Sequence, residues 1–243
     1  MFGIMGTSGA FAQAAGRAGK TPKEKVGEIR LFTQFANPSI SSISCTGEIK
    51  VSSIKNGAPL VETYTDLDGE TLSIQADANT QIVISGAEIT ACDIGENVVY
   101  TKISVENTAL TELNCGSCYA LTALDISNNT ALMELNCGDC YALTALDVSK
   151  NTNITTLECG DCYTLTALDV SKNTAITTLN CSDCEKLVSI SYPATNENVS
   201  AAIAGAITDA TAADGTVYTD SEGAYYSTIA DAATAKGWTI EQL

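Results

Sequence analysis

A repeat of 22 residues constrains this chain more than any other feature. From Asn107 onward, four successive units read NTALTELNCGSCYALTALDISN, NTALMELNCGDCYALTALDVSK, NTNITTLECGDCYTLTALDVSK and NTAITTLNCSDCEKLVSISYPA. Each unit divides into two similar halves of 11 residues. Because self-similarity at a fixed period is the signature of repeat architectures, we expect the repeats to stack as a solenoid.

The two halves of a repeat share one pattern, L-x-x-L-x-L-x-x-N, which is the signature of a leucine-rich repeat. In one half the four slots hold Leu121, Leu124, Ile126 and Asn129. In the other half they hold Leu110, Leu113, Cys115 and Cys118. The alternating x-L-x-V step predicts a short strand whose every second side chain faces inward. The asparagines in the last slot should form a ladder that bonds the turn backbone: Asn107, Asn129, Asn151 and Asn173.

The same alignment interprets the four C-x-x-C pairs, which otherwise suggest a metal or redox centre. The first cysteine of each pair takes a leucine slot and the second takes the turn asparagine. Free cysteine packs as a small hydrophobic residue, so we expect a buried wall of thiols with no metal and no cofactor. A zinc site would need two pairs converging on one point, whereas these pairs should stack along an axis. A metal or redox protein built on the cysteines is the weaker alternative.

The flanks of the repeat region differ from it in pattern. Residues 89–193 are predicted to be a leucine-rich-repeat solenoid of about five coils, starting with Ile89, Cys92, Ile94 and Asn97 on the repeat spacing. Residues 31–88 read as short strands with turns at Asn56-Gly57 and Asp68-Gly69, which predicts a small β cap domain. Residues 194–243 predict an α/β C-terminal cap of two helices and short strands.

Residues 1–30 are predicted to be an extended N-terminal arm that anchors the chain. They contain five of the 12 basic residues, opposed only by Glu24 and Glu28. A glycine-rich basic segment ahead of an acidic body is typical of a docking tail, and a leader without a role is the plain alternative. The basic residues are Arg17, Lys20, Lys23, Lys25 and Arg30.

Composition excludes several classes of function. The formal net charge is -17, which argues against nucleic-acid binding by the body of the chain, because phosphates need a basic face. The chain has no histidine, so a Ser-His-Asp or Cys-His arrangement is impossible, and we expect no enzyme and no catalytic residue. No apolar run reaches the ~18 residues that a membrane helix needs. Ala10-Phe11-Ala12 resembles a signal-peptide cleavage site, but no basic residue precedes it.

The repeats have a counterpart among known families. The LTALDVSKNT segments resemble the 22-residue leucine-rich repeats of surface proteins of gut Bacteroidetes and of structural proteins of their phages. The ending NVSAAIAGAITDATAADGTVYTDSEGAYYSTIADAATAKGWTI is similar to the α/β cap that closes such arrays. The resemblance covers roughly residues 85–243 and implies adhesion or a structural projection. An asparagine pair usually follows the cysteine in that family, and CGDCY departs from this pattern.

Repetition also turns single exposed residues into columns. The predicted columns are Asp125, Asp147 and Asp169; Asp139, Asp161 and Asp183; and Tyr119, Tyr141 and Tyr163. Such columns can stack on sugars or hold Ca²⁺. The structural interpretation, which we favour, is that the tyrosine rings pack on each other and the aspartates bond turn amides.

Together these features predict a non-enzymatic structural or adhesion protein of a phage virion, such as a head fibre or decoration protein. It would assemble in the host cytoplasm, and its arm would contact capsid or other virion proteins. A homo-oligomer and a cell-surface glycan or protein are further partners that fit. The alternative is a secreted or cell-surface bacterial leucine-rich-repeat adhesin, which requires the N-terminus to be a signal peptide.

Overall fold

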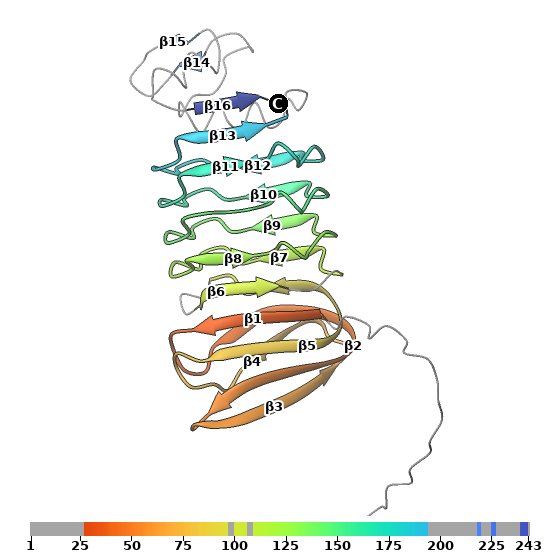
Figure 1. Ribbon diagram of the computed structural model, residues 1–243. Helices are drawn as coiled ribbons and strands as arrows, with labels where there is room; N and C mark the ends of the chain where they lie inside the picture. Colours follow the sequence, from red (N-terminus) through yellow and green to blue (C-terminus); the bar gives the residue numbers. More distant parts are fainter. Residues whose placement is uncertain are drawn as a thin grey trace, which may run out of the picture.

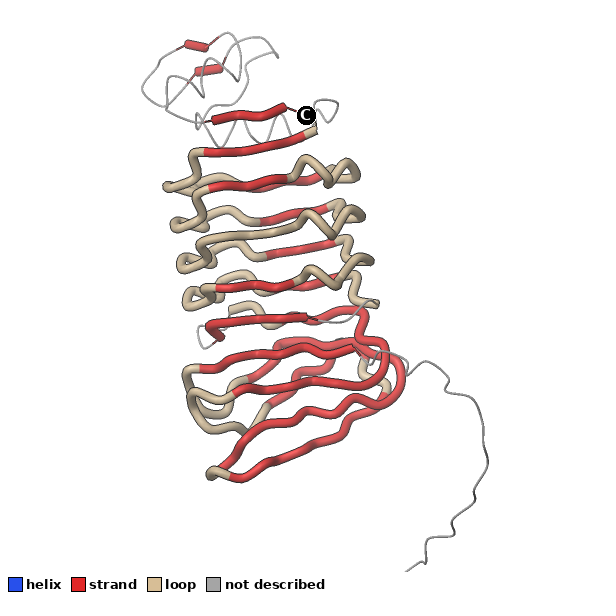
Figure 2. Tube along the Cα trace, in the orientation of Figure 1, coloured by secondary structure: helices blue, strands red, loops and turns tan. Residues whose placement is uncertain are grey.

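The computed structural model describes residues 27–96, 100–105, 109–193, 218–219, 225–226 and 239–242. These residues form a stack of coils with β3 at one end and β16 towards the other (Figure 1). All of them are strands or loops, and none is helical (Figure 2). The strands are β1 (Gly27–Thr33), β2 (Ser39–Lys55), β3 (Ala58–Thr65), β4 (Asp68–Ser73), β5 (Gln81–Asp93), β6 (Tyr100–Val105), β7 (Glu112–Asn114), β8 (Ala123–Asp125), β9 (Glu134–Asn136), β10 (Thr156–Glu158), β11 (Ala167–Asp169), β12 (Thr178–Asn180), β13 (Ser189–Tyr192), β14 (Tyr218–Thr219), β15 (Tyr225–Tyr226) and β16 (Thr239–Gln242).

Two columns of short parallel strands run along the stack. The column that we call the cysteine face contains the end of β5 followed by β7, β9, β10 and β12. The column that we call the aspartate face contains β6, β8, β11, β13 and β16. Neighbouring strands align equivalent repeat positions, so Leu113 pairs with Leu135 and Leu135 with Leu157. The predicted parallel β-solenoid is therefore confirmed, with about four turns.

Each of the strands β7, β9, β10 and β12 on the cysteine face buries its middle residue and leaves the two neighbours exposed or partly exposed. In β9, Leu135 is buried while Glu134 is exposed and Asn136 is partly exposed. The chain then turns sharply inside each C-x-x-C pair. The third residue of that turn has a left-handed backbone, with φ of 58° at Asp139 and 57° at Asp161. Aspartate tolerates this conformation because its short polar side chain bonds locally, which explains the residue type at this position.

The interior of the solenoid is one continuous apolar cluster that also contains a polar ladder. Asn151 and Asn173 are fully buried, and each donates its side-chain amide to two backbone carbonyls of the preceding coil, over 2.8–3.0 Å. Asn129 is equally buried. The predicted ladder is thus confirmed for Asn151 and Asn173, and Asn129 is buried in line with them, whereas Asn107 lies outside the described residues.

The base of the stack is built differently from the prediction. β1 pairs antiparallel with β6 on one side and with the first half of β5 on the other. β5 then bends, and its last residues pair in parallel with β7 on the cysteine face. The boundary predicted at residue 30 is therefore wrong, because it falls inside β1. Residues 27–30 belong to the stack, and their partners lie more than 50 positions away in the sequence, at Gly86 and Val105 among others.

The predicted β cap also differs in detail. The turn at Asn56-Gly57 is confirmed, with φ of 51° and 73°. The turn predicted at Asp68-Gly69 is wrong, because both residues belong to β4. The chain does not reverse there: β3 and β4 both run antiparallel to β2, and the irregularity between them lies at Asp66, where φ is 49° and the carboxylate accepts the Gly47 amide. Strands β1–β5 share one 11-stranded sheet with the solenoid, so no sheet boundary separates residues 31–88 from the repeats.

At the far end, β16 adds in parallel to β13 on the aspartate face, with Ile240 opposite Ile190. β16 is thus one of the short strands that the sequence predicts within residues 194–243. β14 and β15 form a separate antiparallel pair. The first of the two predicted helices and most of the second lie outside the described residues. The prediction is wrong at Tyr225 and Tyr226, which the sequence placed in the second helix and which form β15.

Candidate functional site: the repeated columns

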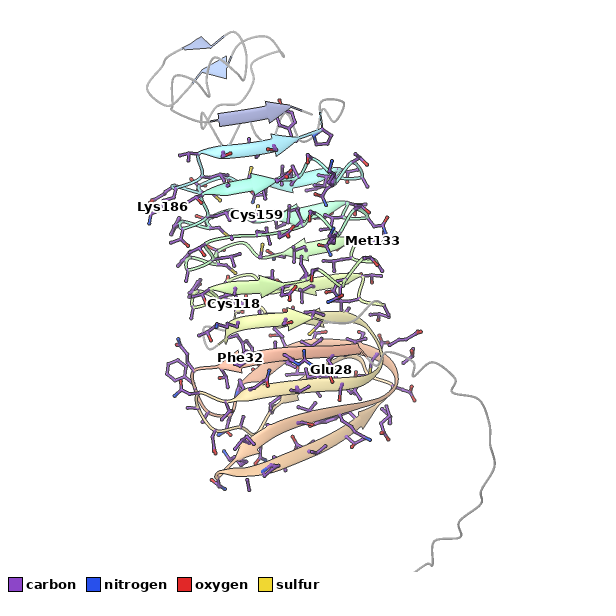
Figure 3. All side chains as sticks on the ribbon, in the orientation of Figure 1. Glu28, Phe32, Cys118, Met133, Cys159 and Lys186 are labelled. Atoms are coloured by element: carbon purple, nitrogen blue, oxygen red, sulfur yellow. The ribbon has the colours of Figure 1, made fainter. Side chains whose placement is uncertain are left out.

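The cysteines line the inside of the coils. All ten cysteines are free thiols, and all ten are buried. Cys115, Cys137, Cys159 and Cys181, the first members of the pairs, are at most 1% exposed. Cys118 and Cys159 lie within the stack, whereas Met133 and Lys186 lie on its outer turns (Figure 3). The predicted burial of the first cysteine of each pair is confirmed.

The second cysteine of each pair donates a hydrogen bond to the backbone of the preceding coil. The Sγ–H of Cys140 donates to the carbonyl of Cys115, and Cys162 does the same to Cys137, each over 3.2 Å. Cys184 repeats the contact with Cys159. These carbonyls belong to the preceding coil and are buried, so an unpaired one would be costly. The second cysteine replaces the turn asparagine, as the alignment of the two halves predicts.

The environment of several of these thiols suppresses their reactivity. Burial raises the pKa of Cys181 to about 12 and holds that of Cys159 well above its ordinary value. A hydrogen bond with Cys162, together with burial, raises the pKa of Cys137. The thiolate is the reactive and metal-binding form, and it is disfavoured at these three cysteines. Cys162 differs, because its hydrogen bond with Cys137 lowers its pKa. Among the described residues, no group of three or more Cys, Asp or Glu side chains is placed to hold a metal ion.

The tyrosine column forms a continuous stack. The rings of Tyr119 and Tyr141 lie 4.7 Å apart at 11°, and those of Tyr141 and Tyr163 lie 4.7 Å apart at 15°. Both faces of the Tyr141 ring are covered by its neighbours, so this ring has no free face for a sugar. The hydroxyls of Tyr141 and Tyr163 donate to Asp139 and Asp161. The structure matches the structural interpretation of this column.

The aspartates of the aspartate face shape the turns that follow the strands. One carboxylate oxygen of Asp147 accepts the backbone N–H of Ser149, over 2.9 Å. Asp125 and Asp169 do the same with Ser127 and Ser171. The hydrogen bonds to Ser149 lower the pKa of Asp147. All three side chains are exposed on the outer surface of the stack.

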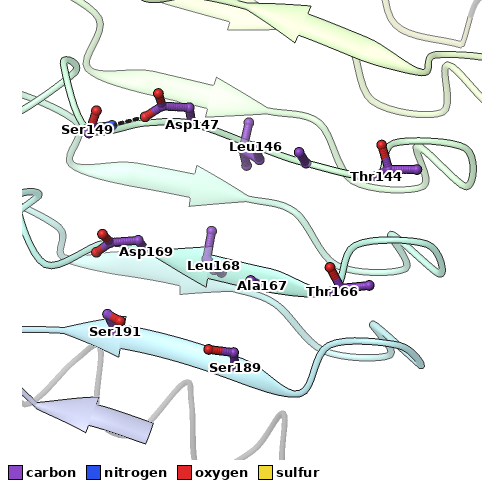
Figure 4. A pocket seen from close by; sticks show the side chains of 11 residues that line it. Thr144, Leu146, Asp147, Ser149, Thr166, Ala167, Leu168, Asp169, Ser189 and Ser191 are labelled. Carbon is purple, nitrogen blue, oxygen red and sulfur yellow. Dashed lines mark hydrogen bonds between the residues drawn. The ribbon is translucent and has the colours of Figure 1, made fainter. Parts of the chain in front are cut away.

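A groove interrupts the aspartate face beside these carboxylates. Residues 145–147 occupy a strand position between β8 and β11 but are not hydrogen-bonded as a strand. The resulting groove has a volume of about 310 Å³ (Figure 4). Its lining combines carboxylates, hydroxyls and small apolar side chains: Asp147, Asp169, Thr144, Thr166, Ser149, Ser189, Ser191, Ala145, Ala167, Leu146 and Leu168. We call it the aspartate groove.

A second groove, not anticipated from the sequence, lies on the cysteine face. It has a volume of about 260 Å³ and is lined by residues of β7, β9 and β10, including Glu112, Glu134 and Glu158. Glu112 and Glu134 are directly opposite in neighbouring parallel strands. The repeated letters T-E-L-N and M-E-L-N contain the signal for two of these carboxylates, while Glu158 stands where the other repeats have asparagine.

The predicted anchor residues fall in two groups. Arg17, Lys20, Lys23 and Lys25 lie outside the described residues. Arg30 lies in the middle of β1, where its guanidinium forms an ion pair with Glu28. Arg30 is therefore part of the folded stack, and the assignment of this residue to an extended arm is wrong.

Comparison of the chain with known protein families, with curated proteins and with solved structures finds no match. In the described part of the chain, no helix is long and apolar enough to cross a membrane.

Proposed function

We propose that this protein is a non-enzymatic structural and adhesion protein of a phage particle, of the head-fibre or decoration type. The observation that carries the proposal is the separation of charge along the chain. Residues 1–26 contain four basic residues and one acidic residue, whereas the whole chain has a net charge of -17. A basic segment ahead of an acidic, self-supporting rod suits a protein that docks at one end and projects from the other.

The repeat architecture supports a projecting role. In a solenoid each coil contacts its neighbours alone, so length and stiffness grow with each added repeat. We propose that the coils are of the leucine-rich-repeat type and number about five when residues 89–105 are counted. The strands at the base and the chain after residue 193 would then act as caps on the two ends of the apolar interior.

The aspartate groove is the surface best suited to adhesion. Its floor contains Ala145 and Ala167, which offer an apolar patch to the C–H face of a sugar ring. Asp147 and Asp169 flank the floor and provide carboxylate oxygens for sugar hydroxyls. The tyrosine column is less suitable, since its rings stack on one another. We therefore propose a cell-surface glycan as the ligand of this groove.

Binding to immobilised bacterial surface polysaccharides tests the adhesion proposal. The variant Asp147→Ala/Asp169→Ala should lose most of the binding, because it removes the acceptors that flank the groove. The matched control is Glu112→Ala/Glu134→Ala, which removes two carboxylates from the cysteine face and should bind normally. Equal binding by both double variants, or none by the unaltered chain, would argue against the aspartate groove.

Particle composition tests the assembly proposal. Phage particles purified on a density gradient should contain the full chain, and a chain lacking residues 1–26 should remain folded but not co-purify. Incorporation of the truncated chain would contradict the anchor. The second candidate, a secreted adhesin, is favoured by the Ala10-Phe11-Ala12 sequence. A native N-terminus just after Ala12 would support that candidate instead.

A further inference from the structure

Strand β3 is an open edge at the base of the stack (Figure 1). It pairs with β2 along one side, and no other described strand pairs with it. Its register with β2 is unbroken over the whole strand. β4 continues the same edge along β2, but it has register shifts against β2 and carries Asp68 and Glu70. Bulges and charges are the usual protection of exposed edges, and β3 lacks the bulges.

The hairpin turn fixes which backbone groups of β3 face outward. Asn56 and Gly57 both have positive φ, as a two-residue type I′ turn requires. In such a hairpin the flanking pair, Lys55 and Ala58, is hydrogen-bonded, and the bonding then alternates along the strand. Leu60, Glu62 and Tyr64 therefore bond to β2. The outward-directed positions are Pro59, Val61, Thr63 and Thr65.

The side chains of β3 suit a further strand. Val61 is 57% exposed, and Thr63 and Thr65 are exposed on the same surface. On the opposite surface Leu60 and Tyr64 are only partly buried, and Tyr64 packs against the margin of the core. Glu62 is the one charged residue of this strand, although the chain has 41 charged residues in all, 29 acidic and 12 basic. An added strand would cover the apolar side chains without burying a row of charges.

We propose that β3 pairs antiparallel with β3 of a second copy of this chain, about a two-fold axis at Thr63. Thr63 then lies opposite its own copy, and Val61 lies opposite Thr65 of that copy. Every outward N–H of residues 61–65 meets a carbonyl in this register. The pairs along the outer surface are β-branched on both sides, which is the combination that cross-strand packing favours.

Other two-fold registers fit less well. An axis at Glu62 would place like charges directly opposite and would use backbone groups that already bond to β2. An axis at Val61 would place Pro59 opposite Thr63, and proline has no N–H to donate. The self-complementary pairing at Thr63 is what favours a second copy over a foreign strand as the occupant. This inference does not depend on the proposed role in a phage particle.

Sedimentation velocity of the full chain over a range of concentrations tests the proposal. The unaltered chain should form a dimer that strengthens with added salt, because two copies of charge -17 repel each other. Thr63→Pro removes an outward N–H, and Thr63→Lys adds a charge to the edge. Each should raise the dimer Kd at least tenfold. Thr152→Lys, an equal charge change at an exposed turn, should leave the Kd unchanged.

Cross-linking tests the register. Thr63→Cys should form a disulfide-linked dimer on mild oxidation, because the two introduced thiols face each other across the axis. Val61→Cys should not, since its opposite residue is Thr65. The unaltered chain, with its buried thiols, gives the background. A chain that is monomeric at every concentration, or a dimer insensitive to both Thr63 variants, overturns the proposal; cross-linking through Val61→Cys in place of Thr63→Cys overturns the register.

Discussion

The thiol of Cys140 lies 3.2 Å from the backbone carbonyl oxygen of Cys115, to which it donates a hydrogen bond. The amide of Asn151 makes the corresponding contact with the carbonyl of Ile126, over 2.9 Å. In both pairs the donor follows the acceptor by 25 residues. A cysteine and an asparagine thus satisfy equivalent buried carbonyls in the two halves of the repeat, although one is a far weaker donor.

Replacement of Cys140 by alanine should destabilise the solenoid measurably. The change removes the donor to the Cys115 carbonyl and leaves a small cavity, which together should cost on the order of 1–2 kcal/mol. Denaturant unfolding followed by circular dichroism measures the effect, with Thr152→Ala at an exposed turn as the control. A Cys140→Ala midpoint equal to that of the control would show that the thiol hydrogen bond contributes nothing.

Substitution of a ladder asparagine should destabilise the solenoid more than substitution of Cys140. Asn151→Ala deletes two hydrogen bonds to buried carbonyls, of Ile126 and Asn129, and should cost roughly 1–3 kcal/mol. Asn153→Ala is a matched control, because this exposed asparagine also donates to a carbonyl of the preceding coil, that of Thr130. Its loss should cost less than about 0.5 kcal/mol, since water replaces the donor. Thermal melts of both variants compare these two costs. Equal shifts of the melting midpoint would contradict the argument that burial makes Asn151 more important.

The sequence was sufficient to predict the stack of coils. At each repeat position the residue type, apolar or polar, indicates whether the side chain faces the interior or the solvent. Leucine at 113, 135 and 157 and the ladder at 151 and 173 follow from spacing alone. β1 could not be predicted in this way: its partners at Gly86 and Val105 are distant, and no local pattern indicates them. The sequence predicted a turn at Asp68-Gly69 because this is a strong turn dipeptide, yet Gly69 uses its positive φ inside β4 and the chain continues in the same direction along β2.

The columns were also predictable, but not all of their surroundings. Stacking of Tyr141 follows from a ring at the same position in each coil. The aspartate groove depends on residues 145–147 lacking strand hydrogen bonds, although their sequence, Ala-Leu-Asp, is identical to that of β8 and β11. Identical letters cannot distinguish these three positions, so the groove required the structure.

Alkaline pH should destabilise the protein through its thiols. Burial raises the pKa of Cys92 and Cys181 to about 12, whereas an exposed thiol in the unfolded chain titrates near 8.5. Between these values the unfolded chain loses protons that the folded chain keeps, so stability is complete below about pH 8.5 and falls as pH rises towards 12. In this range each such thiol lowers the free energy of unfolding by on the order of 1 kcal/mol per pH unit. Urea midpoints at pH 7 and pH 10 test this, and Cys181→Ala should reduce the dependence; a midpoint that is constant across this range would contradict it.

The tyrosine stack should stabilise the coils according to the number of neighbours of each ring. Tyr141 contacts two rings and Tyr163 contacts one, so Tyr141→Ala should lower the melting midpoint more than Tyr163→Ala. Tyr141→Phe keeps both ring contacts and loses only the partly buried hydrogen bond to Asp139, and it should melt close to the unaltered chain. Near-ultraviolet circular dichroism reports the stacking directly: its signal should fall with Tyr141→Ala and persist with Tyr141→Phe. If the two alanine variants melt together, or if the phenylalanine variant is the least stable, the column is held by its hydroxyl–carboxylate contacts and not by its rings.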